Sequence, residues 1–194
     1  MLLRNRSVIL TSMALVTFLA PSADAQETVA PKAPVKVDEK KSGSPRVADK
    51  KGQRKNAAAK AKQREKNLRA VMDKLGVGAG AVVADIGAGD GRDSWVFADV
   101  VGDSGVVYAE EIAQDKVDDL KESVEKREVS QVRPVLGENN DPGLPPDSVD
   151  MAFMHYVYHH LSQPREMLDG IWRSLKPGGY LVVVDRHRGT LQDW

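Results

Sequence analysis

The chain has 194 residues, 41% hydrophobic and 5% aromatic, a composition that supports one domain with a real core and leaves no room for a second. The 28 basic and 28 acidic residues cancel, but basic residues far outnumber acids between Lys32 and Arg69, so we expect the folded part to be net acidic. Because cysteine is absent, disulfides, thiolate metal sites and a thiol nucleophile are excluded.

Residues 1–25 have the features of a secretory signal peptide. Arg4 and Arg6 precede an apolar run from Val8 to Ala20, and Ala23-Asp24-Ala25 is a small-x-small cleavage site. The run is shorter than the roughly 20 apolar residues that span a bilayer, so an uncleaved anchor is the less favoured alternative. We therefore expect a periplasmic or secreted protein with no transmembrane span after cleavage.

Residues 26–55 are predicted to form a disordered basic linker. The segment consists mainly of Pro, Lys, Ala, Glu and Ser, and it has too few large apolar residues to offset the entropy of ordering. Its cations could hold an anionic envelope polymer, a membrane surface or nucleic acid. No aromatic residues are interleaved, so a solvated tether is favoured and no specific nucleic-acid partner is expected.

Residues 56–194 are predicted to be the folded domain, in which helices and strands alternate. Four helices are expected, at residues 56–75, 94–101, 113–128 and 164–175. Five strands are expected, at residues 81–86, 105–109, 131–136, 149–154 and 180–184. This alternation implies right-handed crossovers and predicts an α/β fold, a doubly wound and mostly parallel sheet with helices on both faces.

A glycine-rich loop follows the first predicted strand. In Val83-Ala84-Asp85-Ile86-Gly87-Ala88-Gly89-Asp90-Gly91, an apolar strand delivers an acid and three alternate glycines to its carboxyl end, where ligands bind in a doubly wound sheet. A dinucleotide fingerprint would place its third glycine where Arg92 stands, and Asp85 would repel a pyrophosphate. The acid instead favours a cationic ligand, and a sulfonium cofactor with an α-ammonium group suits it.

A second acid follows the next predicted strand, in Val107-Tyr108-Ala109-Glu110-Glu111-Ile112. An acid roughly 20 residues beyond such a loop accepts hydrogen bonds from paired ribose hydroxyls. Counting along the strand places Glu111 at its tip, and Glu110 is the near alternative.

Together these segments resemble class I S-adenosylmethionine-dependent methyltransferases, over residues 68–186. The Asp-x-Gly-x-Gly-x-Gly loop and the acid after the second strand occur in that family's order and spacing. So do Leu144-Pro145 with Ser148-Val149-Asp150, and Leu175-Lys176-Pro177-Gly178-Gly179. The last motif also has a purely structural explanation, because proline and two glycines end a helix and start a strand. The resemblance implies a Rossmann-like fold and S-adenosyl-L-methionine as the cofactor.

The resemblance also implies which residues contact that cofactor. The glycine loop would contact the methionine portion, Glu111 the ribose, and a polar residue after the third strand, for which we choose Asn140, the adenine amine. The implied cofactor-binding set is Asp85, Gly87, Ala88, Gly89, Gly91, Glu111, Ile112 and Asn140.

Histidines follow the fourth predicted strand, in His155-Tyr156-Val157-Tyr158-His159-His160. His155 and His159 have the spacing of a zinc-binding helix, but Tyr156 stands where a metalloprotease has Glu and no third ligand is evident, so no metal site is predicted. Methyl transfer mainly needs alignment of the reactants and exclusion of water. For a hydroxyl or protonated amine acceptor, His159 or His160 is predicted to be catalytic and to remove the proton. Packing or capping of the next helix is the alternative role.

These patterns predict an enzyme that methylates a small molecule, a lipid or another envelope component. The alternative is a non-catalytic, exported ligand-binding or interaction module on a degenerate methyltransferase fold, and a nicotinamide oxidoreductase is less favoured. Without cysteine, thiol-dependent methylation of arsenite is not expected. The acceptor atom and the oligomeric state are not specified by these patterns.

The C-terminal end of the domain is expected to be incomplete, because the resembling family usually adds two strands after the fifth. The last predicted strand, with Leu181, Val182, Val183 and Val184, would then be an uncovered apolar edge, which folded proteins normally avoid.

Overall fold

The structure, a computed structural model, describes residues 7–10 and 50–185. Most of the predicted signal peptide and residues 26–49 of the predicted linker lie outside the described residues. Within the described part of the chain, no helix is both long enough and apolar enough to cross a membrane.

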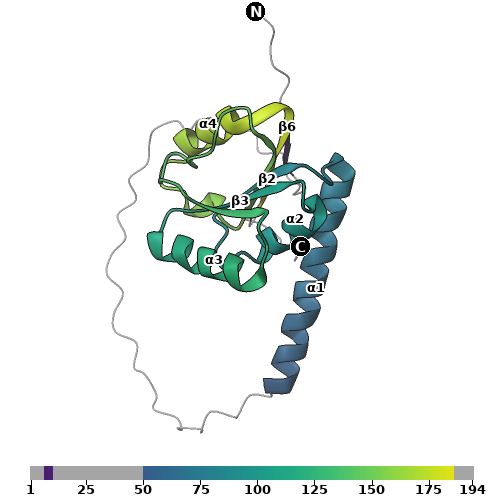
Figure 1. Cartoon of the computed structure of the whole chain (residues 1–194). Coiled ribbons are helices and arrows are strands. Elements are labelled where there is room, and N and C mark those ends of the chain that lie inside the picture. The colour runs from purple at the N-terminus through teal and green to yellow at the C-terminus, as the bar shows by residue number, and fades with distance from the viewer. Residues whose placement is uncertain (1–6, 11–49, 186–194) are drawn as a thin grey trace, which may run out of the picture.

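Six strands form one sheet in the order β1-β6-β5-β2-β3-β4, and every neighbouring pair is parallel (Figure 1). The strands are β1 (Ser7–Leu10), β2 (Val82–Ile86), β3 (Val106–Glu111), β4 (Val132–Leu136), β5 (Val149–His155) and β6 (Leu175–Val184). The chain runs outward from β2 through β3 to β4, then crosses back to place β5 on the other side of β2. Such a reversal opens a crevice at the carboxyl ends of the strands.

Helices cover both faces of the sheet, which confirms the predicted doubly wound α/β fold. They are α1 (Lys50–Leu75), α2 (Arg92–Val101), α3 (Gln114–Arg127), the short 3-10 helix η1 (Tyr158–His160) and α4 (Pro164–Ser174). Side chains of α1, α2 and α3 pack into one core cluster, whereas those of α4 pack into the cluster on the opposite face.

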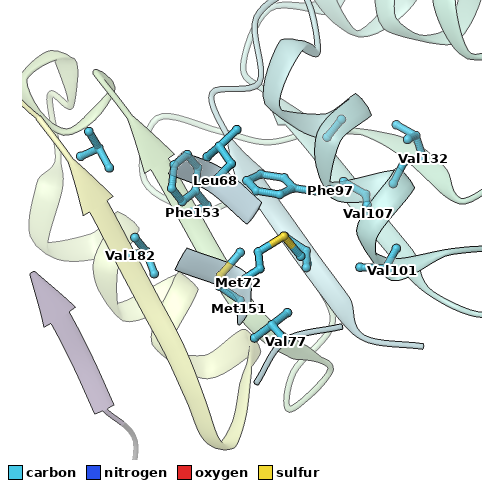
Figure 2. Packing of buried hydrophobic residues seen from close by; sticks show 14 of the residues in the cluster. Leu68, Met72, Val77, Phe97, Val101, Val107, Val132, Met151, Phe153 and Val182 are labelled. Atoms are coloured by element: carbon cyan, nitrogen blue, oxygen red, sulfur yellow. The ribbon is translucent and has the colours of Figure 1, made fainter. Parts of the chain in front are cut away.

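The two cores follow from the alternation of side chains along the strands. On β3, Val107 and Ala109 belong to the first cluster and Tyr108 contacts the second, as a period of two residues requires. Figure 2 shows the first cluster, where Phe97 of α2 meets Phe153 of β5 edge to face with ring centroids 5.2 Å apart. Aromatic pairs favour this geometry, and the contact fixes α2 against the centre of the sheet.

The helix α1 joins this core through its second half. Leu68 and Met72, one helical turn apart, are fully buried, so one stripe of the helix faces the sheet (Figure 2). Arg64 lies one turn before Leu68 on the same stripe and is therefore directed toward the domain. The helix begins at Lys50 and takes in the last six residues of the predicted linker, 50–55, where Lys, Gln and Arg favour a helix despite Gly52.

The edge of β6 is covered, which corrects the expectation of an open edge. β1 pairs with β6 in parallel, with Ser7 opposite Tyr180 and Leu10 opposite Val183. The sequence pattern does not reveal this pairing, because residues 7–10 fall in the apolar run of the predicted signal peptide.

The strand β6 starts earlier than predicted and carries an irregularity. Leu175 lies opposite Val149, and the next pair is Tyr180 with Met151, so residues 176–179 bulge from the ladder. Lys176 in this bulge bonds the carboxylate of Asp150 at 2.8 Å, and the same oxygen accepts the N–H of Val82 at 2.8 Å. The Lys-Pro-Gly-Gly motif thus links β6 to β5 and β2 at the amino-terminal edge of the sheet, opposite the edge where ligands bind. This agrees with the structural explanation of the motif.

Candidate cofactor-binding site

The glycine loop between β2 and α2 has a backbone that only glycine adopts readily. The φ angles of Gly87, Gly89 and Gly91 are +68°, +57° and +73°. A Cβ on Gly87 would lie 2.5 Å from a methyl of Val157, whereas no atom lies within 4 Å of a Cβ placed on Gly89. The loop therefore packs closely against the segment after β5 but leaves open space at Gly89, where a ligand can approach the backbone.

Both acids at the end of β3 bind this loop. Gly89 donates its N–H to Oε1 of Glu111 at 2.7 Å, and Gly87 donates its N–H to Oε2 of Glu110 at 3.1 Å. Glu111 stays partly exposed, but Glu110 is only 1% exposed. The two acids that the sequence left as alternatives therefore both lie at the site, in different environments.

A cavity of about 240 Å³ lies beside the loop. Its wall consists of Ile86, Gly87, Glu110, Glu111, Ile112, Asn139, Val157, His160, Leu161, Ser162 and Met167. Of the predicted cofactor-binding set, Gly87, Glu111 and Ile112 line it directly. Asn139 is the amide in its wall, and the predicted Asn140, the next residue of the loop after β4, does not line the cavity.

The residues of this site suit a charged nucleoside cofactor. Ile112 is 52% exposed, an apolar side chain at the cavity wall that could pack on a flat base. Beside it Glu111 offers a carboxylate, and the open face at Gly89 gives a ligand room to reach the backbone.

Asp85 has a different place from the one we expected. Its carboxyl is 2% exposed, accepts the hydroxyl of Ser94 at 2.6 Å and does not line the cavity. Burial and the nearby charge of Asp93 raise the pKa of Asp85 to about 7, although the bond from Ser94 opposes the shift. In the described structure, Asp85 therefore holds the first turn of α2 beneath the glycine loop.

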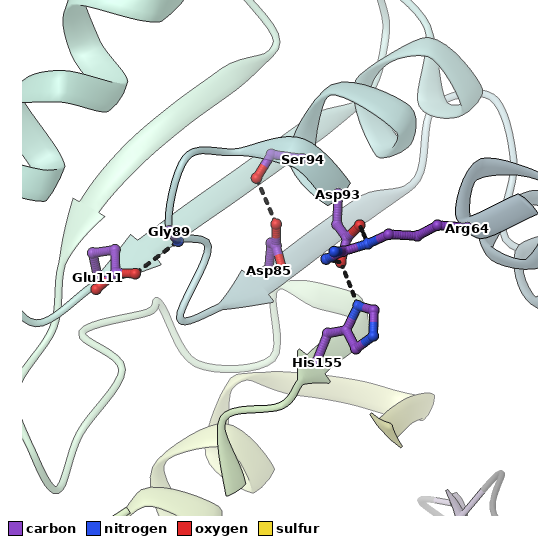
Figure 3. A network of polar contacts seen from close by, with 7 residues as sticks. All are labelled: Arg64, Asp85, Gly89, Asp93, Ser94, Glu111 and His155. Atoms are coloured by element: carbon purple, nitrogen blue, oxygen red, sulfur yellow. Dashed lines mark hydrogen bonds and ion pairs between the residues drawn. The ribbon is translucent and has the colours of Figure 1, made fainter. Parts of the chain in front are cut away.

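A buried network joins α1, α2 and β5 next to Asp85 (Figure 3). Arg64 binds both carboxylate oxygens of Asp93 at 2.5 Å, and Nδ1 of His155 lies 3.0 Å from Oδ2 of the same carboxylate. Burial opposes ionisation of Asp93, but the bonds with His155 and Arg64 outweigh it and hold the pKa of Asp93 below its ordinary value. Arg64 and Asp93 were not predicted as site residues, because they lie 29 residues apart on different helices.

The two predicted catalytic histidines lie in η1, at the end of β5. His159 points Nδ1 at Oδ1 of Asp185 at 2.7 Å and donates its backbone N–H to Oδ2 of the same residue at 3.0 Å. His160 lines the cavity, and its ring centroid lies 4.0 Å from that of His159. Asp185 was missed as a site residue, although an acid directly after the last strand, at the same edge as the glycine loop, was a usable signal.

Comparison with known proteins identifies the class to which this fold and site belong. A crystal structure of a SAM-dependent methyltransferase from Aquifex aeolicus is 30% identical, with a TM-score of 0.60, over 66% of this chain and 68% of that chain. The Haemonchus contortus Phospholethanolamine N-methyltransferase 2, in complex with phosphomonomethylethanolamine and S-adenosylhomocysteine, shares the fold at 22% identity and a TM-score of 0.53, over 60% of this chain and 27% of that chain. The fold is that of SAM-dependent methyltransferases, and S-adenosylmethionine is the cofactor of that class.

The family assignment follows from the match of a methyltransferase domain to residues 84–183. The chain belongs to this methyltransferase domain family. Among curated relatives, the arsenite methyltransferase of Halobacterium salinarum is 27% identical over 106 residues, which is 55% of this chain. The chain spans only 27% of the length of that relative.

Proposed function

We propose that this chain transfers a methyl group from S-adenosyl-L-methionine to an O–H or N–H group of a small molecule or envelope component. The observation that carries the acceptor class is the pairing of His159 with Asp185 beside the cavity. When bound, the cofactor supplies a methyl group on a positively charged sulfur.

The cofactor is bound by the glycine loop and by the acids at the end of β3. Glu111 accepts hydrogen bonds from ribose hydroxyls, as the family resemblance implies, and its bond to Gly89 keeps the carboxylate in place beforehand. Ile112 packs on the base and Asn139 offers an amide at the same wall. The open face of Gly89 leaves room for the methionine portion.

The proton of the acceptor is removed by His159. Asp185 accepts the Nδ1–H of His159 and so selects the tautomer whose Nε2 carries a lone pair. Because Asp185 also accepts the backbone N–H of His159, both the ring and its main chain are held. His160, whose ring lies tilted against that of His159, lines the cavity and positions the pair at the cavity wall.

Arsenite is not proposed as the acceptor. The name of the Halobacterium relative concerns that protein, and the chain described here has no cysteine with which to hold trivalent arsenic. An oxygen or nitrogen acceptor agrees better with a histidine held by a carboxylate.

The test is calorimetric titration with S-adenosylmethionine, S-adenosylhomocysteine and NAD, followed by transfer of labelled methyl groups to small-molecule and envelope extracts. We expect micromolar or tighter binding of the first two ligands, no binding of NAD, and labelled product. Glu111→Gln should weaken both cofactor affinities, and the exposed Glu125→Gln on α3 is its control. Binding of NAD alone, or of none of the three, would contradict the proposal.

A further inference from the structure

The first half of α1 extends past the rest of the domain as a free helix (Figure 1). Residues 55–63 are all exposed, and Leu68 is the first side chain of the helix that is buried, among those described. Leu68 is also the first large apolar residue of α1, because residues 50–67 contain no Val, Leu, Ile, Met or aromatic residue. This half of the helix therefore has no apolar face with which to join a hydrophobic core.

Charge is distributed unevenly between this helix and the domain. Residues 55–69 contain six basic residues and one acid, whereas residues 71–185 contain 21 acidic and 10 basic residues. The two arginines of the helical stretch pair with acids of α2. Its lysines form no ion pair with any other described residue, and they are Lys55, Lys60, Lys62 and Lys66. A helix with free positive charges is thus attached to an acidic domain.

Three of these lysines lie on one face of the helix. Lys55, Lys62 and Lys66 are seven and four residues apart, a spacing that returns a helix to nearly the same side. Leu68, which packs in the core, follows Lys66 by two residues and so lies about 200° around the helix. This lysine face of α1 therefore points away from the domain, and a flat surface can lie against it without contacting the acidic domain.

The free half of α1 leaves the domain at the edge of the sheet where the cavity lies. Arg64, one turn before Leu68, pairs with Asp93 in the first turn of α2. Asp93 follows the glycine loop directly, and Gly87 of that loop lines the cavity. A surface held by the lysine face therefore lies close to this edge of the sheet.

We propose that the lysine face of α1 docks the protein on an anionic lipid bilayer. A bilayer surface is flat and negatively charged, which matches cations gathered on one face of a helix. The acidic domain, on the other side of the helix, stays away from that surface and so does not oppose the attraction. The inference goes beyond the proposed function, because docking requires neither the cofactor nor methyl transfer.

Nucleic acid fits the lysine face less well. A helix in the major groove of a duplex reads base edges with its side chains and has phosphates on both sides, whereas the lysine face presents its charges on one side. Single strands are bound by stacking of bases on aromatic side chains, and α1 has no aromatic residue. A flat anionic partner therefore agrees better with this helix.

The test is co-sedimentation of the full chain with two kinds of vesicle, one of phosphatidylcholine alone and one of equal parts phosphatidylcholine and phosphatidylglycerol. We expect tighter binding to the anionic vesicles, and we expect high salt to remove this preference because it screens exposed charges. The apolar run of residues 8–20 would bind both kinds of vesicle alike. The difference between the two affinities therefore measures the electrostatic contribution.

The test variant combines Lys55→Gln, Lys62→Gln and Lys66→Gln, and glutamine preserves the helix propensity of lysine. We expect it to bind anionic vesicles about 10²-fold more weakly than wild type, or about fivefold for each lysine. Circular dichroism and an unchanged affinity for S-adenosylhomocysteine would show that the variant keeps the native fold.

The control variant removes the same amount of charge from a different exposed helix. It combines Lys116→Gln, Lys121→Gln and Lys126→Gln on α3, where each lysine already pairs with an acid of the same helix. Because these charges are already compensated, we expect the control to bind anionic vesicles about as tightly as wild type.

Three outcomes would overturn the inference. The first is equal affinity of the wild-type protein for both kinds of vesicle, or an equal loss of affinity in the two triple variants. The second is tighter binding to a DNA duplex of mixed sequence than to anionic vesicles at the same salt concentration, which would assign the lysine face to nucleic acid. The third is a dimer, detected by light scattering, that dissociates in the test variant, which would assign this face to a second copy of the chain.

Discussion

The imidazole Nδ1 of His159 lies 2.7 Å from Oδ1 of Asp185, which joins the turn after β5 to the end of β6. The side chain of Asp185 is 14% exposed and that of His159 is 34% exposed, so the carboxylate is shielded while the ring still reaches solvent. A shielded acceptor on one ring nitrogen leaves the other to exchange protons with a bound molecule.

Replacing His159 with Gln should lower the rate of methyl transfer about 10²-fold or more, since general base catalysis contributes that much. Asp185→Asn should also lower the rate, because the ring of His159 loses the carboxylate that holds its tautomer and orientation. The exposed Asp169→Asn on α4 serves as the control. Unchanged rates and pH profiles in both site variants would leave η1 with a structural role only.

Gly89→Ala should abolish cofactor binding while the protein stays folded. Its φ of +57° makes alanine unfavourable by about 1–2 kcal/mol, and the added methyl group enters the open space where the ligand approaches. Gly76, directly after α1 at the opposite edge of the sheet, has a φ of +68°, and a Cβ placed on it would also have no atom within 4 Å. Gly76→Ala should therefore cost similar stability, measured by urea unfolding, and leave S-adenosylhomocysteine affinity unchanged.

Arg64→Met should destabilise the fold by about 1–3 kcal/mol, since it leaves the buried charge of Asp93 with His155 as its remaining partner in the network of Figure 3. We set this below the cost of breaking a fully buried pair because the side chain of Arg64 is 35% exposed. Arg69→Met removes the pairs with Glu65 and Asp99 on the exposed part of the same helix and should cost about 0–1 kcal/mol. Equal losses of unfolding free energy in the two variants, measured with urea, would mean that the buried network adds no stability.

Stability should fall as the pH rises from 4 to 7, because folded Asp85 retains a proton that the unfolded chain loses. Its pKa is raised from 3.8 to about 7 in the folded chain, so between these values the folded protein binds more protons than the unfolded chain. Raising the pH then favours unfolding, by at most about 1.4 kcal/mol per pH unit for one group. Urea unfolding of Asp85→Asn should show a shallower decline than wild type over this range, and the exposed Asp90→Asn should not.

Export predicts a defined N-terminus. If residues 1–25 are a cleaved signal peptide, the exported protein begins at Gln26, and mass spectrometry of the periplasmic or secreted fraction measures this directly. Replacing Ala25 with a bulky residue such as Phe should block cleavage. A full-length chain that remains in the cell fraction would contradict the predicted localisation.

Most of the fold could be predicted because its signals are local. The apolar run at Ala81–Ile86, the glycines that follow it and the charged helix that became α3 each indicate their own structure from a few neighbouring residues. Their boundaries agree with the structure to within one or two residues, apart from the start of α1 and the start of β6.

The site was predictable only in part, because several contacts depend on how distant elements pack. Glu111 could be placed by counting along β3 and Ile112 from the family resemblance, and both line the cavity. Neither the Arg64–Asp93 pair nor the space for Glu110 beside Gly137 has a local signal. Both depend on how α1 and the loop after β4 pack against the sheet.

The four residues of β1 have two assignments that exclude each other in any one molecule. A chain whose backbone at Ser7–Leu10 is hydrogen-bonded to β6 still carries its first 25 residues, and a chain cut after Ala25 has lost that strand. Processing would then expose a row of main-chain donors and acceptors along Tyr180–Val183, the kind of surface to which another extended segment can add. Maturation would therefore change the border of the sheet and not merely shorten the chain.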